Sequence, residues 1–143
     1  MTFNTFYKNN LNFELTNAQK SVLKEIRNDF RSGNQMTRLL QGDVGSGKTI
    51  VSLMAMLIAI DNSYQCCLVA PTEILALQHF DSFSKHLNGL NLDIELLTGS
   101  TKKSERKRLF QDLENGEINI LIGTHAIFEE NVIFKNLGFS VID

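Results

Sequence analysis

The segment from Gly42 to Thr49 constrains the fold of this chain more than any other part of its sequence. Its residues follow the pattern G-x-x-x-x-G-K-[ST] of a phosphate-binding loop. In such a loop, glycines let successive backbone N–H groups point at phosphate oxygens, and the next helix adds the positive end of its dipole. The pattern requires a strand before the loop and a helix after it. The flanking sequence fits a short strand over 36–41 and an apolar helix over 50–60.

Two side chains of this loop have separate expected roles. Lys48 supplies a positive charge for the outer phosphates of a nucleotide, and the hydroxyl of Thr49 is suited to Mg²⁺. The alternative is a chance glycine-rich turn, which the flanking strand and helix disfavour. The candidate phosphate-binding residues are Gly42, Asp43, Val44, Gly45, Ser46, Gly47, Lys48 and Thr49.

Length and composition fit one domain with no general attraction to nucleic acid. The chain has 143 residues and a formal net charge of −2, so any contact with DNA must come from local groups. The longest apolar stretch, 50–60, is shorter than the roughly 20 residues that a membrane-spanning helix needs. Cys66 and Cys67 are adjacent in an apolar strand, which predicts buried free thiols in a reducing compartment such as the cytoplasm.

Beyond the loop, apolar runs of strand length alternate with helical patterns. This alternation predicts an α/β fold with a mostly parallel sheet, whose ligands bind at the carboxyl ends of the strands. The segments that follow strands should therefore line one rim. The predicted helices cover about 16–31, 50–60, 74–87 and 102–114; the predicted strands cover 36–41, 65–70, 93–97, 118–123 and 139–142; the rim segments are 42–49, 71–73, 98–100, 124–125 and Asp143, and 124–138 is expected to be irregular.

Some residues allow two interpretations from sequence. Gln19 either closes a capping box with Thr16 or presents its amide to an adenine edge. The basic run 102–108 is either a solvated helix face or a nucleic-acid contact, and the solvated face is the more common case. His79 and His86 lack metal-ligand spacing and are expected to be ordinary helix residues.

Six short pieces, taken together and in order, resemble superfamily 2 helicases, and most closely the RecG-type ATP-dependent DNA helicases that remodel branched DNA. The resemblance covers about 13–143, and Thr72-Glu73-Ile74 is more similar to the RecG type than to the transcription-repair coupling translocase. Leu77 departs from the polar residue expected there. The pieces are Leu15 to Gln19, Gln41 to Thr49, Ala70 to Ala76, Leu97 to Ser100, Gly123 to Ala126 and Val141 to Asp143.

This resemblance implies a RecA-like P-loop NTPase fold that binds ATP and Mg²⁺. It favours the adenine-reading role for Gln19, and it implies that Asp143 holds Mg²⁺ together with Thr49, with Lys48 and Asp143 as catalytic residues. The residues implied to contact the DNA backbone are Pro71, Thr72, Glu73, Thr98, Gly99, Thr124 and His125. Contacts of this kind are blind to base sequence.

The resemblance also implies an incomplete motor. Residues 1–12 are expected to be a poorly ordered lead-in, and 13–143 part of the first RecA-like lobe. The glutamate after Asp143, the second lobe with its arginine finger, and the wedge domain lie outside the chain, so the fragment should be inactive. A family strand that separates 36–41 from 139–142 is also missing. This predicts either a gap between those strands, with a tendency to aggregate, or a rearrangement that closes the gap.

The expected function is therefore the ATP-binding part of a cytoplasmic helicase that drives DNA translocation and branch migration in recombination and repair. The alternative is a stand-alone nucleotide-binding module that never hydrolyses ATP, or a gene remnant. A small kinase is the weakest reading, because the pieces at 70–76 and 123–126 have no role in one.

Overall fold

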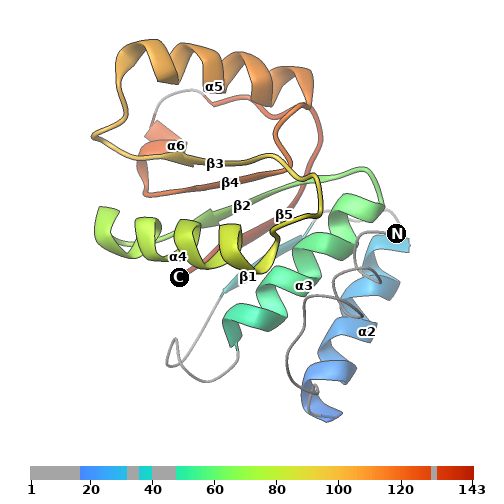
Figure 1. The fold of residues 1–143 in the computed structure, drawn as a ribbon. Helices are drawn as coiled ribbons and strands as arrows, with labels where there is room; N and C mark the ends of the chain where they lie inside the picture. The colour runs from blue at the N-terminus through green and yellow to red at the C-terminus, as the bar shows by residue number, and fades with distance from the viewer. Residues whose placement is uncertain (1–16, 32–35, 40–47, 130–131) are drawn as a thin grey trace.

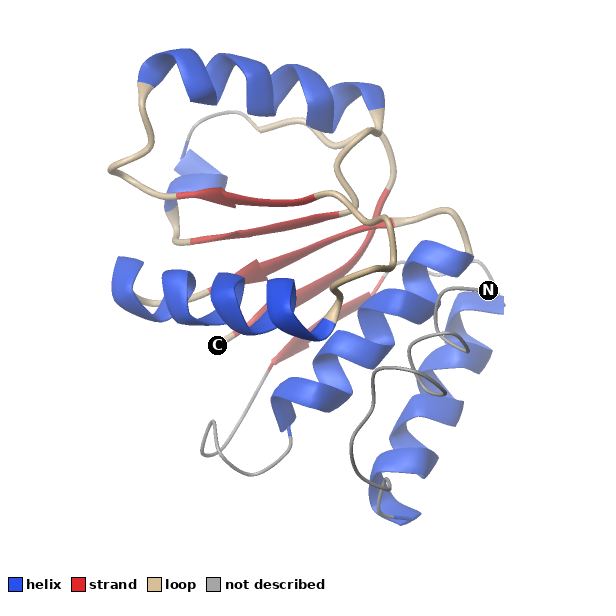
Figure 2. Cartoon of the chain, viewed as in Figure 1, coloured by secondary structure: helices blue, strands red, loops and turns tan. Residues whose placement is uncertain are grey.

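Helices and strands alternate along the chain in the computed structural model (Figure 2), as the sequence predicts. The structure describes residues 17–31, 36–39, 48–129 and 132–143. The expected lead-in at 1–12 lies outside these residues. The elements in chain order are α2 (Asn17–Arg31), β1 (Met36–Leu39), α3 (Lys48–Asp61), β2 (Gln65–Val69), α4 (Glu73–His86), β3 (Ile94–Leu97), α5 (Lys103–Asn115), β4 (Ile120–Gly123), α6 (Ala126–Glu129) and β5 (Leu137–Ile142).

The five described strands form one parallel sheet in the order β1-β5-β2-β4-β3 (Figure 1). The first and last strands are not separated by a gap, so the open-gap expectation is wrong and the alternative, a closed sheet, is found. β5 pairs directly with β1, from Met36 opposite Phe139 to Leu39 opposite Ile142. This pairing gives partners to backbone N–H and C=O groups that a gap would leave without them, so the expected reason for aggregation is removed.

Alternate residues of the central strands face opposite sides of the sheet, as the pleat requires. In β2, Cys66 and Leu68 join one buried cluster with residues of α2, α3 and α4. Cys67 and Val69 join a second cluster with residues of α5 and α6. Helices therefore cover both faces, which explains why these strands read as continuous apolar runs.

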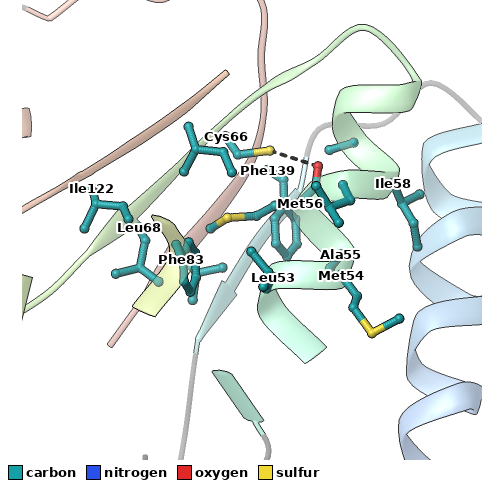
Figure 3. Packing of buried hydrophobic residues seen from close by; sticks show 14 of the residues in the cluster. Leu53, Met54, Ala55, Met56, Ile58, Cys66, Leu68, Phe83, Ile122 and Phe139 are labelled. Carbon is teal, nitrogen blue, oxygen red and sulfur yellow. Dashed lines mark hydrogen bonds between the residues drawn. The ribbon is translucent and has the colours of Figure 1, made fainter. Parts of the chain in front are cut away.

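Helix α3 lies in the middle of the first cluster (Figure 3). Leu53, Met54, Met56 and Leu57 are all fully buried, because α3 packs against the sheet on one side and α2 on the other. The prediction that this helix is packed on several sides, with its methionines in the core, is confirmed. None of the described helices combines the length and the apolarity needed to cross a bilayer.

Local sequence signals set the ends of the next helices. The Thr72 hydroxyl accepts a hydrogen bond from the Leu75 N–H at 3.2 Å and caps α4. Gly116 ends α5 with a φ of 80°, a left-handed conformation that favours glycine. The segment 124–138 was predicted to be irregular, but it contains the short helix α6 and the first residues of β5. One turn of helix is too short to give a clear apolar period, which explains the error.

Candidate nucleotide and nucleic-acid sites

The phosphate loop itself, Gly42 to Gly47, lies outside the described residues. The elements on each side of it are described: β1 ends at Leu39, and α3 begins at Lys48. The strand and helix that the pattern requires are therefore confirmed. For Gln19, Lys48 and Thr49 the structure describes the helical backbone and not the side chains, so their roles stay predictions.

The carboxyl ends of the strands lie in line at one edge of the sheet (Figure 1). The register pairs Leu39 with Ile142, Ile142 with Val69, Val69 with Gly123, and Gly123 with Leu97. The segments after these residues must share one rim, as predicted. This rim carries the sequence-predicted candidates at 71–73, 98–99, 124–125 and 143.

Asp143 follows β5 at this rim, and His79 of α4 contacts its side chain. The two atoms His79 Nε2 and Asp143 Oδ2 are 3.0 Å apart. The His79 side chain is 4% exposed, whereas that of Asp143 is 19% exposed and so remains open to the rim. Sequence reasoning missed this contact, because nothing in the spacing of His79 indicates a partner 64 residues away.

Glu73 and the turn after β3 are joined by hydrogen bonds. The Glu73 carboxylate accepts from the backbone N–H of Ser100 at 3.0 Å and from its hydroxyl at 2.8 Å. Pro71, Thr72 and Glu73 are exposed. Two of the three segments expected to contact DNA are thus side by side, but a carboxylate already binds the Ser100 donors.

Arg106 shapes the same turn from the first part of α5. Its guanidinium donates to the carbonyl oxygens of Thr98 at 2.7 Å, Gly99 at 3.1 Å and Thr101 at 2.9 Å. Thr98 itself is buried, with 6% of its surface exposed, whereas Gly99 is exposed. Of the predicted pair, Gly99 is therefore the residue whose backbone can meet a ligand.

The third segment begins where β4 comes close to β3. A Cβ added to Gly123 would lie 2.1 Å from the Leu97 carbonyl oxygen, so only glycine fits there. Beyond it, Thr124 is partly buried and its hydroxyl accepts from the Ala126 N–H at 3.4 Å, while His125 is exposed. This arrangement places His125 at the rim surface and leaves Thr124 in a local helix-starting role.

The basic run at the start of α5 is a solvated face with its own acidic partners. Arg108 forms ion pairs with Glu95 at 3.1 Å, Glu105 at 3.0 Å and Asp112 at 3.2 Å. Partial burial raises the pKa of Glu95, and the hydrogen bond from Arg108 opposes that rise. Arg106 points into the turn and Arg108 is paired, which supports the solvated-face interpretation.

With this geometry established, comparison with known proteins identifies the class. The DEAD/DEAH box helicase family model matches residues 16–143. The chain therefore belongs to the DEAD/DEAH box helicase family. Within that class it is similar to RecG proteins. It is 48% identical over 133 residues to the ATP-dependent DNA helicase RecG of Synechocystis sp., covering 93% of this chain and 16% of that protein.

Two further matches are also RecG proteins, and each covers most of this chain but only a small part of the relative. The ATP-dependent DNA helicase RecG of Staphylococcus aureus is 50% identical, over 93% of this chain and 19% of that protein. The solved structure of RecG bound to a three-way DNA junction superposes with a TM-score of 0.86 at 39% identity, covering 97% of this chain and 22% of that one. The expected RecA-like α/β fold and the resemblance to RecG are confirmed. The chain spans less than a quarter of these proteins.

Proposed function

We propose that this chain is the ATP-binding part of a RecG-like DNA helicase that couples ATP hydrolysis to DNA translocation and branch migration in recombination and repair. The observation that carries this proposal is the identity of 46–50% to RecG proteins over 93% or more of the chain. It is supported by a rim that carries Asp143 together with the candidate DNA residues Pro71, Gly99 and His125. A cytoplasmic location fits both the buried free thiols and a DNA substrate.

In this proposal the phosphate loop binds the ATP phosphates, and Lys48 neutralises charge on the outer ones. Gln19 reads the adenine. Thr49 and Asp143 would hold Mg²⁺, which would supply positive charge to the phosphates. The donor set fits this ion, since Asp143 Oδ1 has no hydrogen-bond partner among the described residues and a single carboxylate with substrate phosphates is a common Mg²⁺ site.

The proposed DNA contacts are sequence-blind and use the rim. The exposed Pro71, Gly99 and His125 are the residues most open to a phosphate backbone. Each of the three exposed residues has a threonine as its neighbour in the sequence, and these threonines are proposed to assist the same contacts. They are Thr72, Thr98 and Thr124. The Glu73 carboxylate occupies the Ser100 donors, and its negative charge repels phosphate. DNA binding at that turn therefore requires the carboxylate to move or to stay beside the phosphate path.

The alternative is a nucleotide-binding module that does not hydrolyse ATP. The two functions differ in what happens when the rest of a helicase is supplied. In the chimaera, residues 13–143 of this chain replace the matching segment of the Staphylococcus aureus RecG, which is half identical to this chain. ATP hydrolysis is then measured with and without three-way junction DNA, for the chimaera, its Lys48→Ala variant and the unmodified RecG.

The helicase proposal predicts hydrolysis that junction DNA stimulates and that Lys48→Ala abolishes. The 143-residue chain alone should show no ATP hydrolysis, because the arginine finger is expected from a second lobe. Such a finger is worth about 10³–10⁵ in rate in related phosphoryl-transfer proteins. A folded chimaera that binds ATP without hydrolysing it supports the non-hydrolysing module. DNA-stimulated phosphate release by the chain alone would refute the expected dependence on a second lobe.

A further inference from the structure

The contact between His79 and Asp143 has no role in the function proposed so far, although it reaches the candidate metal ligand. His79 lies in the middle of α4, on the sheet face that also carries α3. Asp143 lies at the end of β5, where its backbone N–H donates to the Val69 carbonyl oxygen at 2.8 Å. Both ends of the contact are therefore fixed by regular secondary structure.

Packing within the protein holds the His79 ring in place independently of its hydrogen bond to the carboxylate. Its side chain is 4% exposed, and the Phe83 ring, one helical turn away, meets it edge-on with centroids 6.3 Å apart and planes at 70°. A buried ring packed in this way has little freedom to rotate. The position of Nε2 is thus set by the fold.

The chemistry of the pair fixes the direction of the hydrogen bond. An ionised carboxylate only accepts, so His79 Nε2 carries the hydrogen and donates to Asp143 Oδ2. A neutral imidazole is sufficient for this. Oδ2 is then engaged, and Oδ1 has no partner among the described residues. Outer partners of this kind orient metal-ligating carboxylates, and their loss typically lowers metal affinity about 10–100-fold.

We propose that His79 is a positioning residue, which holds the Asp143 carboxylate in one orientation so that Oδ1 is available to the Mg²⁺ of Mg-ATP. This inference rests on the proposed nucleotide-binding function. A buried histidine that merely needs a hydrogen-bond partner would use the same contact, and its loss would lower the stability of the chain. It would not change the dependence of nucleotide affinity on Mg²⁺.

The test compares ATP affinity in Mg²⁺ with ATP affinity in EDTA, by calorimetry on the 143-residue chain. The variants are His79→Leu, which removes the donor; His79→Phe, which keeps an aromatic ring beside Phe83; His79→Gln, whose amide can still donate; and Asp143→Asn. Circular dichroism checks that each variant folds. The quantity compared is the ratio of the two affinities.

The proposal predicts that His79→Leu and His79→Phe lower this ratio about 10–100-fold and leave the affinity in EDTA unchanged. His79→Gln should retain most of the ratio. Adding His79→Leu to Asp143→Asn should produce little further loss, because the two residues act as one unit. An unchanged ratio in both His79→Leu and His79→Phe overturns the proposal. Failure of both variants to fold also overturns it, because the role of His79 would then be to stabilise the fold.

Failure of the underlying function gives a different result. If the wild-type chain shows no Mg²⁺-dependent ATP binding, the nucleotide-binding function is contradicted, and the role of His79 falls with it. If the wild type shows Mg²⁺-dependent ATP binding and the His79 variants have the same affinity ratio as the wild type, the nucleotide-binding function stands. The positioning role alone is then contradicted.

Discussion

Cys66 and Cys67 are neighbours in β2, yet their thiols face opposite sides of the sheet. Cys66 Sγ donates to the Met56 carbonyl oxygen at 3.5 Å (Figure 3), and Cys67 Sγ lies 3.3 Å from the Ser140 hydroxyl oxygen. Both are free, as predicted. Burial raises the pKa of both thiols, most strongly for Cys66.

These pKa shifts predict a loss of stability at alkaline pH. Above the ordinary thiol value of 9.0, the unfolded chain releases the protons and the folded chain retains them, so the free energy of unfolding falls as pH rises. Each thiol contributes up to about 1.4 kcal/mol per pH unit. Urea titrations between pH 8 and 11 should show a steeper decline for the wild type than for Cys66→Ala/Cys67→Ala. Equal slopes would contradict the burial of the thiols.

Gln19 has two possible roles, and each predicts a different effect of Gln19→Ala. The adenine-reading role predicts that affinity for Mg-ATP falls more than affinity for Mg-GTP or Mg-CTP, with the melting temperature little changed. The capping role predicts the reverse, a loss of about 0.5–2 kcal/mol in stability and an unchanged base preference. Competition binding with the three nucleotides, alongside thermal unfolding, separates the two.

At the scale of elements, α3 is the centre of the larger core cluster. Leu53 is fully buried in this cluster, whereas Leu77 on α4 is 49% exposed. Leu53→Ala should lower the free energy of unfolding by about 2–5 kcal/mol, because it leaves a cavity. The matched control Leu77→Ala should change it by less than about 0.5 kcal/mol. Urea unfolding followed by circular dichroism measures both, and similar losses for the two would contradict the packing of α3.

The strand β1 is held in the described sheet by β5 alone, whereas β2 is flanked by β5 and β4. Edge strands open more readily than central ones. Hydrogen exchange in β1 should therefore be at least about tenfold faster than in β2, yet clearly slower than in an unpaired segment. Complete lack of protection in β1 would indicate that β1 is not paired with β5 and that a gap separates the two strands. Protection equal to that of β2 would require a partner on its other side.

For the whole molecule, sequence patterns predict the alternation of elements, the parallel sheet and the single rim, because each depends on local periodicity and on strand direction. They do not predict which strands are neighbours. The β1 and β5 pairing joins residues about a hundred positions apart, and no local signal encodes it.

The site shows the same division between local and long-range information. The phosphate loop and Asp143 are visible as short motifs, and their contexts are confirmed where the structure describes them. The partners of His79, Glu73 and Arg106 depend on tertiary packing. Gln65 is a further example: its buried amide donates to the Leu113 and Ile118 carbonyl oxygens and accepts from the Asn136 N–H, contacts that its position in an apolar strand does not indicate.

Binding of Mg-ATP to the 143-residue chain tests the central claim most directly. Calorimetric titrations compare the wild type, Lys48→Ala and Lys107→Ala, the last being an exposed lysine of α5 that controls for the loss of one charge. The account predicts binding by the wild type and by Lys107→Ala, and a loss of about 1.5–3 kcal/mol in Lys48→Ala, the usual contribution of a hydrogen bond to a charged group. Equal affinity for all three forms would contradict it.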